Sequence, residues 1–325
     1  MEQLKDNLGR KITYVRISVT DRCNYRCRYC MPAEGLPFIP HDQILSYEEI
    51  TYLCRVLRDV GISKVRFTGG EPLVRKGFVD FVKFFKQELP EMKVAITTNG
   101  ALLNTLKDRL SELNLTSINI SLDTLDPVKF RHITRCGELY RVIEGITGFS
   151  EVSKTQIKLN AVLIRDFNDT EVFDLLAFAQ RTQSLLRFIE FMPLDDGVWD
   201  KNCFISSNEI LSIINKNNEW TPIIKKISSD DGPARYFKNK FTGQHMGIIS
   251  AVSHHFCSTC NRLRVTATGD LKPCLFSGES IPLRHEIQTN NRESIISLLK
   301  ESIKMKPFCW KNLNISEKHM SQIGG

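Results

Sequence analysis

The sequence predicts an α/β protein, built as a partial parallel barrel of six β/α units with a smaller α+β region at its C-terminal end. Three observations favour this fold. Apolar runs alternate with helical patterns from residue 14 to residue 191, polar and apolar side chains alternate within those runs, and the pattern changes after about residue 217. Six units are too few for a closed eight-stranded barrel, so an open doubly wound sheet is the alternative.

The predicted strands are short runs that end in turn signals. They cover residues 14–19, 63–68, 93–97, 116–122, 156–163 and 185–191. Amphipathic patterns between them predict helices at 46–60, 76–88, 101–112, 140–151 and 169–182. Each of the first five strands is therefore followed by a helix that can cross over to the next parallel strand.

After about residue 217 short β-like runs replace this alternation. They cover residues 220–226, 234–238, 246–250 and 262–267, and a helix is expected at 291–304. Turn signals such as Asp231-Gly232-Pro233 separate them. We therefore expect the partial barrel in residues 1–217 and the smaller region in residues 218–325.

Alternation within the strands gives the predicted sheet one polar face. Parallel strands covered by helices are usually apolar on both faces, and buried unpaired charge is costly. A polar face therefore needs water, ion-pair partners or an anionic ligand. Its members are Arg16, Ser18, Arg66, Thr68, Thr97, Asn99, Asn119, Ser121, Lys158 and Asn160. A solvated open sheet is one reading, but a barrel lined by these groups, forming a deep cavity for an anion, fits better.

Composition narrows the class of protein. The chain has 325 residues, of which 42% are hydrophobic and 25% charged, with a net charge of +7. That charge indicates an anionic ligand. The sequence contains no dense run of Lys and Arg, so it does not indicate nucleic-acid binding. The N-terminal segment lacks an apolar signal region, and no stretch reaches the roughly 18 apolar residues of a membrane span. We expect a cytoplasmic protein with no membrane or nucleic-acid partner.

Three of the ten cysteines follow the first predicted strand directly, as Cys23, Cys27 and Cys30 in a C-x3-C-x2-C pattern. Disulfides are rare in a reducing compartment, which favours metal binding. Three thiolates on one loop can ligate three irons of a [4Fe–4S] cluster and leave the fourth iron open. Zinc is the alternative, although the next histidine, His41, stands in a separate turn segment.

The second strand ends in Gly69-Gly70-Glu71-Pro72, where glycine lets the backbone approach a ligand and Glu71 can accept from an ammonium group. Together with the cysteine loop, this turn resembles the radical S-adenosylmethionine (SAM) superfamily. The resemblance implies a TIM-like partial (β/α)6 barrel with the cluster at its mouth. It also implies that the open iron binds SAM, which is cleaved to a 5′-deoxyadenosyl radical.

A second group, Cys257, Cys260 and Cys274, follows the pattern C-x2-C-x13-C. A second [4Fe–4S] cluster with one open iron is one interpretation, and a zinc knuckle completed by His254 or His255 is the other. Arg262 and Arg264 lie between these cysteines on a predicted strand, so both point the same way. Arginine is suited to phosphate or to the edge of a planar base.

The chain as a whole resembles the GTP 3′,8-cyclases of molybdenum cofactor (molybdopterin) biosynthesis, the MoaA family. The matching motifs are SVTDRCNYRCRYCMP, RFTGGEPLVR, TTNG, SLDTLD, KLNAVLIRDFND, RFIEFMPL, GPARY, FCSTCNRLRVTATGDLKPCLF and the terminal Gly324-Gly325. The resemblance implies a lyase that converts GTP to (8S)-3′,8-cyclo-7,8-dihydroguanosine 5′-triphosphate. It also implies that cyclic pyranopterin monophosphate synthase (MoaC) takes the product, that a reductase or flavodoxin-type protein donates electrons, and that the enzyme is a homodimer.

The resemblance also implies roles for single residues, with the second cluster binding guanine through its open iron and the Gly324-Gly325 tail reaching into the active site. The SAM contacts are Tyr29, Gly70, Ser121 and Met192. The GTP contacts are Arg16, Arg66, Thr97, Lys158, Arg262, Leu263 and Arg264. Cys136 departs from the family pattern, and its role is open.

Two other functions are consistent with paired cysteine groups. A twin-cluster radical SAM enzyme acting on a peptide or another substrate would not need the Arg-Leu-Arg segment within its second cysteine loop. A nucleic-acid-binding protein with two metal knuckles would show basic patches interleaved with exposed aromatic residues, and would bind zinc.

Overall fold

The computed structural model describes residues 3–194, 199–223, 232–313 and 320–323. One twelve-stranded sheet runs in the order β12-β11-β10-β1-β2-β3-β4-β5-β6-β9-β8-β7. Its six central strands are mutually parallel and follow the order of the chain. They are β1 (Tyr14–Ser18), β2 (Lys64–Thr68), β3 (Lys93–Thr98), β4 (Ser117–Ser121), β5 (Gln156–Leu163) and β6 (Leu185–Glu190).

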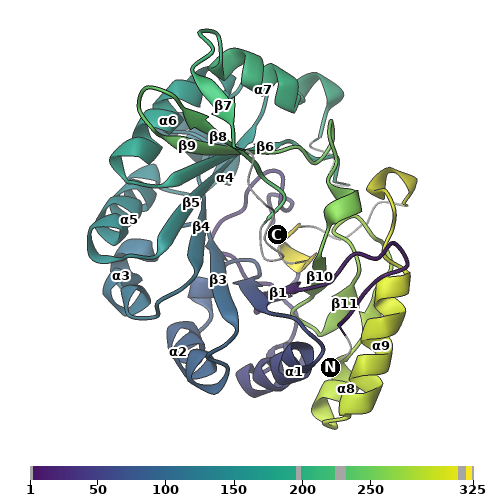
Figure 1. Cartoon of the computed structure of the whole chain (residues 1–325). Helices are drawn as coiled ribbons and strands as arrows, with labels where there is room; N and C mark the ends of the chain where they lie inside the picture. The colour runs from purple at the N-terminus through teal and green to yellow at the C-terminus, as the bar shows by residue number, and fades with distance from the viewer. Residues whose placement is uncertain (1–2, 195–198, 224–231, 314–319, 324–325) are drawn as a thin grey trace.

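Helices cover the outside of this curved sheet, as Figure 1 shows. They are α1 (Tyr47–Asp59), α2 (Phe78–Glu88), α3 (Leu103–Ser111), α4 (Pro127–Thr134), α5 (Leu139–Val152), α6 (Val172–Arg181) and α7 (Ser207–Ile214). The predicted barrel architecture is confirmed, and every predicted strand and helix of residues 14–191 is present with ends shifted by three residues or fewer.

Two helices of the barrel, α4 and α7, were missing from the sequence prediction. Helix α4 starts at Asp126, whose side chain accepts from two backbone N–H groups, with Pro127 in the first position. Helix α7 starts with a capping box between Ser206 and Glu209. Both have eight residues, so their apolar periodicity is too short to be recognised, although their caps are visible in the sequence.

The apolar face of the sheet packs against the helices. Phe67 on β2 contacts Phe78, Phe81 and Phe85 of α2 edge to face, with ring centroids 5.1–6.2 Å apart. Val15, Ile17 and Val19 are fully buried on the same side. The polar side chains of these strands therefore point to the inside of the curve, as the alternation predicts.

The C-terminal residues add strands to both edges of the barrel. These elements are β7 (Trp220–Pro222), β8 (Arg235–Asn239), β9 (His245–Ile249), β10 (Arg262–Val265), β11 (Asp270–Lys272), β12 (Ile281–Pro282), α8 (Arg284–Gln288), α9 (Arg292–Lys304) and α10 (Met320–Ile323). Strand β9 pairs in parallel with β6, and β10 pairs in parallel with β1 (Figure 1). The division at residue 217 stays a prediction, because strands on both sides of it share one sheet.

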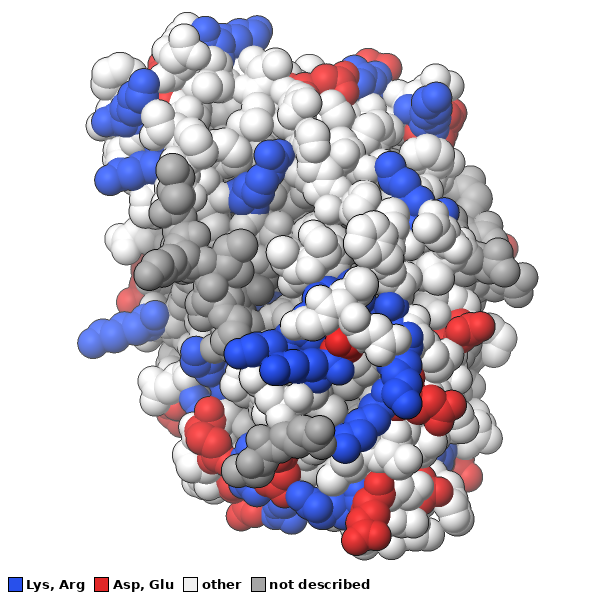
Figure 2. Space-filling view, turned by 45° about the vertical axis from the view of Figure 1, so that its right-hand side comes forward, with Lys and Arg blue, Asp and Glu red and all other residues white. Residues whose placement is uncertain are grey.

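Among the helices that the structure describes, none combines the length and apolarity needed to cross a bilayer. On the face shown in Figure 2, Lys and Arg side chains gather mainly in the lower half, where Asp and Glu stand among them. Much of the upper half is uncharged. The positive charge of this face is therefore not one unbroken basic surface.

Candidate active site between two cysteine groups

A cavity of about 290 Å³ fills the inside of the barrel, and all six cysteines of the two predicted groups line it. Strand direction separates the groups. The loop with Cys23, Cys27 and Cys30 follows β1, so it lies at the carboxyl ends of the parallel strands. Cys257 and Cys260 precede β10, which runs parallel to β1, and Cys274 follows the antiparallel β11. The second group therefore lies at the opposite, amino end of the barrel.

The side chain of Arg135 and a backbone N–H group hold the first cysteine loop in place. Arg135 donates from Nη1 to the carbonyl oxygens of Arg26 and Met31, both at 2.8 Å. The backbone N–H of Tyr25 points to Cys23 Sγ at 3.4 Å. N–H groups aimed at sulfur are typical of iron–sulfur ligands. The loop thus presents three thiols to the cavity from a fixed backbone.

The Gly-Gly-Glu-Pro turn braces the same loop. The N–H of Gly70 donates to Thr20 O and that of Glu71 to Arg22 O, each at 2.8 Å. A Cβ on Gly70 would lie 2.3 Å from Arg22 O, so a side chain there is excluded by backbone. The Glu71 carboxylate is 1% exposed and accepts from Leu73, Thr98 and Asn99. It therefore holds the turn together instead of facing an ammonium group in the cavity.

The second group is held by a cation as well. Lys306 donates from Nζ to Arg262 O at 2.7 Å and to Pro273 O at 2.9 Å, joining the two parts of the cysteine loop. Burial alone would raise the pKa of Cys260, but the charges of Arg262 and Lys306 lower it to about 6. At the first group burial raises the pKa of Cys23 to about 12. A metal bound beside Cys23 would favour its thiolate form.

The donor set at each end fits a cluster. Within the described part of the chain, no three His, Cys, Asp or Glu side chains meet around one point as a single metal ion requires. Three thiols that line the same end of the cavity would instead suit a cubane, in which each thiolate binds a different iron. Of the two histidines considered as zinc ligands, His254 is exposed and His255 Nε2 lies 3.4 Å from Cys309 Sγ.

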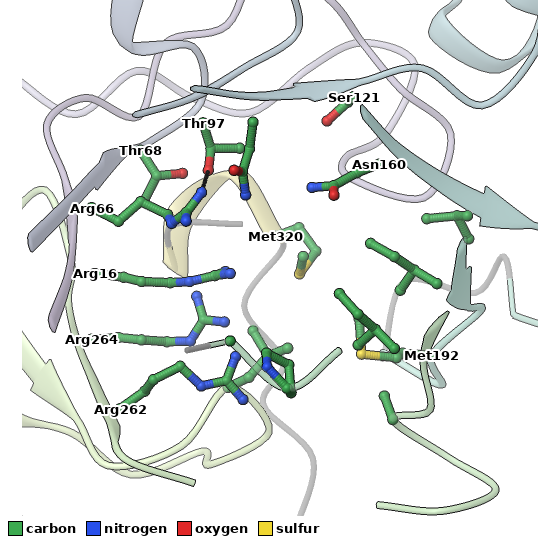
Figure 3. Close-up of a pocket in the computed structure, with 18 of the residues that line it drawn as sticks. Arg16, Arg66, Thr68, Thr97, Ser121, Asn160, Met192, Arg262, Arg264 and Met320 are labelled. Carbon is green, nitrogen blue, oxygen red and sulfur yellow. Dashed lines mark hydrogen bonds between the residues drawn. The ribbon is translucent and has the colours of Figure 1, made fainter. Parts of the chain in front are cut away.

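Cations line the wall between the two cysteine groups. Figure 3 shows the guanidinium groups of Arg16, Arg66, Arg262 and Arg264 reaching into the cavity from neighbouring strands. Arg66 donates to Thr97 Oγ1 at 3.2 Å. The polar strand face predicted from alternation lines this cavity except for Ser18, which donates to Thr20 O.

Sequence reasoning missed three charged or ionisable residues of this wall. Tyr14 is the first residue of β1, two positions before Arg16, and so lies on the same strand face. Lys64 has the same relation to Arg66 on β2. Arg187 on β6 also lines the cavity and donates to Asn160 Oδ1. The same alternation rule applied to Leu-Leu-Arg-Phe-Ile-Glu finds Arg187, since Leu186 and Phe188 beside it are buried in the core.

The crowded cations perturb one another. Burial, followed by the charges of Arg187, Arg66 and Lys64, lowers the pKa of Lys158 to about 7. Burial and the charges of Arg16 and Arg262 hold the pKa of Arg264 well below its usual range. An anion entering this space would relieve that repulsion, so the wall is suited to a polyanionic ligand.

The four residues predicted to contact SAM also line the cavity: Tyr29, Gly70, Ser121 and Met192. Tyr29 donates to Asp123 Oδ2 at 2.5 Å, and Asp123 was not singled out from the sequence. Met320 of α10 reaches the same space in Figure 3. The side chain of Leu263 does not reach it, because this residue faces the hydrophobic core between Arg262 and Arg264. Gly324 and Gly325 lie outside the described residues.

Sequence comparison extends over almost the whole chain. Residues 17–179 match the Radical SAM superfamily, and residues 184–311 match Molybdenum Cofactor Synthesis C. The GTP 3′,8-cyclase of Thermodesulfovibrio yellowstonii is 40% identical over 99% of this chain and 100% of its own length. That of Alkaliphilus oremlandii is 41% identical with the same coverage. Molybdenum cofactor biosynthesis protein 1 of Bos taurus is 40% identical over 89% of this chain, which spans 46% of that protein.

Solved structures share the fold at low sequence identity. SuiB of Streptococcus suis bound to S-adenosylmethionine superposes with a TM-score of 0.62 over 91% of this chain and 67% of its own, at 15% identity. SuiB bound to its precursor peptide SuiA gives a TM-score of 0.57 at 17% identity, covering 81% of this chain and 60% of SuiB. These likenesses show a shared fold.

Proposed function

We propose a reaction for this chain from the premise that it belongs to the GTP 3′,8-cyclases of the radical SAM superfamily. The reaction converts GTP to (8S)-3′,8-cyclo-7,8-dihydroguanosine 5′-triphosphate, the first step of molybdenum cofactor biosynthesis. The observation that carries the proposal is a single cavity with cysteine groups at opposite ends and cations between them.

At the carboxyl end, Cys23, Cys27 and Cys30 would hold a [4Fe–4S] cluster whose open iron takes SAM. With SAM bound there, a reduced cluster would supply the electron for cleaving SAM, and the resulting radical chemistry would remove the 3′ hydrogen of the GTP ribose. The chain contributes the SAM pocket. Gly70 lets its turn pack closely against the cysteine loop, and Tyr29, Ser121 and Met192 would line the SAM pocket.

At the amino end, Cys257, Cys260 and Cys274 would hold a second [4Fe–4S] cluster, with guanine at its open iron. Arg262 lies beside this group, with Nη2 3.8 Å from Cys260 Sγ. Leu263 would contribute through its backbone, since its side chain is in the core. The Gly324-Gly325 tail, which lies outside the described residues, would reach into the active site.

The triphosphate would lie along the wall of cations, held by Arg16, Arg66, Thr97, Lys158 and Arg264. Several cations fixed on the strands of a rigid sheet orient a polyanion without rearranging, which places its ribose toward the SAM end. This wall supports GTP over the peptide of the alternative twin-cluster enzyme.

The same family membership supports proposals for the location, oligomeric state and partner proteins of this chain. We propose a cytoplasmic homodimer that receives electrons from a reductase or a flavodoxin-type protein and passes its product to cyclic pyranopterin monophosphate synthase. Size measurement in solution and assays with candidate donors test these points.

Anaerobic incubation of the reconstituted protein with GTP, SAM and a reductant tests the reaction. We expect a product with the mass of GTP and the chromatographic behaviour of the 3′,8-cyclised dihydroguanosine triphosphate, together with 5′-deoxyadenosine. About eight irons per chain should accompany activity if two four-iron clusters form. Zinc with no iron, or 5′-deoxyadenosine with unchanged GTP, would contradict the proposal.

A further inference from the structure

Tyr14 lies among the cations of the cavity, where a tyrosine is unexpected. It opens β1 and pairs across the sheet with Lys64 of β2 on one side and Arg262 of β10 on the other. The residue is 2% exposed and lines the cavity. Its phenol oxygen accepts a hydrogen bond from Nε of Arg66 and is also hydrogen-bonded by the side chain of Arg16.

The partners of this oxygen are donors only. A guanidinium group has N–H donors and no acceptor, so two arginines offer nothing to which a neutral phenol could donate its proton. A phenolate accepts from both. Lys64 Nζ also lies 5.3 Å from the centre of the Tyr14 ring, on its face.

In the described part of the chain, the charged strand residues that interact electrostatically with Tyr14 are positive. They are Arg16 on β1, Lys64 and Arg66 on β2, Lys158 on β5, Arg187 on β6, and Arg262 and Arg264 on β10. Among the described lining residues the one carboxylate is Asp123, which is bonded to Tyr29 at the other end of the cavity. Burial by itself raises the pKa of Tyr14, but the charges of Arg66, Arg16 and Lys64 lower it to about 6.

We propose that Tyr14 is the internal counter-ion of this wall: as a phenolate it holds the guanidinium groups of Arg16 and Arg66 apart and in position until triphosphate oxygens replace it. The phenolate then takes up one proton from solvent and becomes a neutral phenol. No other bond changes. This inference rests on the proposed function, because it states that Tyr14 takes up a proton when GTP binds.

A distinct dependence on pH follows. Above about pH 6 the ligand-free protein carries the phenolate, so binding of the anion must draw in a proton. The affinity for GTP therefore falls as pH rises, by up to about tenfold per pH unit for each proton taken up. Lys158 contributes a second proton above about pH 7, because the triphosphate raises its lowered pKa. Without the Tyr14 hydroxyl, GTP binding should take up only the proton that goes to Lys158.

The experiment is anaerobic calorimetry of the holoenzyme titrated with GTP near pH 8, in buffers of different ionisation enthalpy, which counts the protons taken up. Tyr14→Phe should take up about one proton fewer than the wild type. Tyr236→Phe is the matched control, because it removes a phenol that faces Arg187 from outside the wall, and it should leave the count unchanged. Equal counts for Tyr14→Phe and wild type would overturn the inference. A wild type that does not bind GTP would instead count against the proposed function.

A second variant separates a counter-ion from a merely structural side chain. Tyr14→Glu places a permanent anion among the same cations, so it should weaken GTP binding near pH 8 at least tenfold relative to Tyr14→Phe. Equal weakening by both variants indicates packing alone and overturns the proposal.

If neither variant folds, a measurement on the wild type still tests the proposal. Adding GTP should abolish the near-ultraviolet absorption of one tyrosinate, and an unchanged tyrosinate band contradicts the inference.

Discussion

The two ends of the cavity are built alike and charged in opposite ways. At each end one cation joins a cysteine loop by donating to two carbonyl oxygens, Arg135 at the first and Lys306 at the second. The charges around the sulfur atoms differ. The carboxylates of Glu71 and Asp123 lie near the first group and raise the pKa of its thiols, after burial and hydrogen bonding within the group. Arg262 and Lys306 dominate at the second.

This difference matches the two ligands. SAM carries a positive sulfonium and an ammonium group, so it is favoured at the end where the nearby charges are negative. GTP carries several negative charges and is favoured where they are positive. Equal numbers of cysteines therefore do not mean equal sites. Under the proposed function, the surrounding charges would decide which ligand binds at each end.

Removing one cysteine from each end tests this division most strongly. Cys23→Ala should abolish both 5′-deoxyadenosine formation and product from GTP, because the SAM end is lost. Cys257→Ala should retain 5′-deoxyadenosine formation and lose the cyclised product. Both products are measured by chromatography and mass analysis.

The isolated cysteines beside each group give matched controls. Cys136→Ala, next to the first loop, and Cys309→Ala, next to the second, should both keep iron content and activity. Loss of SAM cleavage in Cys257→Ala with retention in Cys23→Ala would mean that the two ends are reversed.

Gly70→Ala tests the SAM end without touching a sulfur atom. The new Cβ would lie 2.3 Å from Arg22 O, so backbone must move at a cost of about 1–3 kcal/mol. SAM affinity, measured by equilibrium binding, should fall about tenfold to a hundredfold with GTP affinity nearly unchanged. Gly232→Ala also alters a residue that lines the cavity but meets open space, and it should bind SAM normally. A parallel loss of GTP affinity in Gly70→Ala would show that the ends are not independent.

Arg264→Ala and Lys158→Met test the cation wall. Each removes a charge that would contact triphosphate, which costs about 1.5–3 kcal/mol, or tenfold to a hundredfold in GTP affinity. SAM affinity should change little. Exposed Arg109→Ala is the control on the outer surface. Equal effects on both ligands would undercut the assignment of these cations to GTP.

The smallest expected effect concerns stability. The pKa of Lys158 is lowered to about 7 in the folded protein, below the usual value of 10.5. Between those values the unfolded chain binds more protons, so this lysine makes the folded state more stable as pH rises from 7 toward 10.5. Lys158→Met should remove that part of the rise, seen as a flatter profile of melting temperature against pH. If the profile of Lys158→Met matches that of the wild type, the pKa of Lys158 is not lowered and its amine is solvated.

The sequence was most informative where one physical rule acted locally. Alternation along each strand identified the lining of the cavity, including Arg16, Arg66 and Lys158, before any contact was known. It was less informative about partners distant in sequence. Strands β9 and β10 join the edges of β6 and β1, although adjacent strands are usually consecutive.

Individual roles were also harder to predict than positions. Glu71 looked available to a ligand, but three donors from its own neighbourhood satisfy it. Tyr14 reads as an ordinary buried aromatic residue until the guanidinium groups around its oxygen are seen. Such roles depend on which side chains meet across strands, and the periodicity of a single strand contains no information on that.

The pairing of β10 with β1 also has a consequence for how the chain folds during translation. Arg10, just before β1, donates to Cys257 O, a partner 247 positions later in the chain. At about 5–20 residues per second, the ribosome leaves this edge of the sheet uncovered for roughly 12–50 s. An uncovered strand edge invites pairing with other chains. We therefore expect nascent chains to need protection by chaperones, and truncation before β10 to yield aggregates instead of a smaller enzyme.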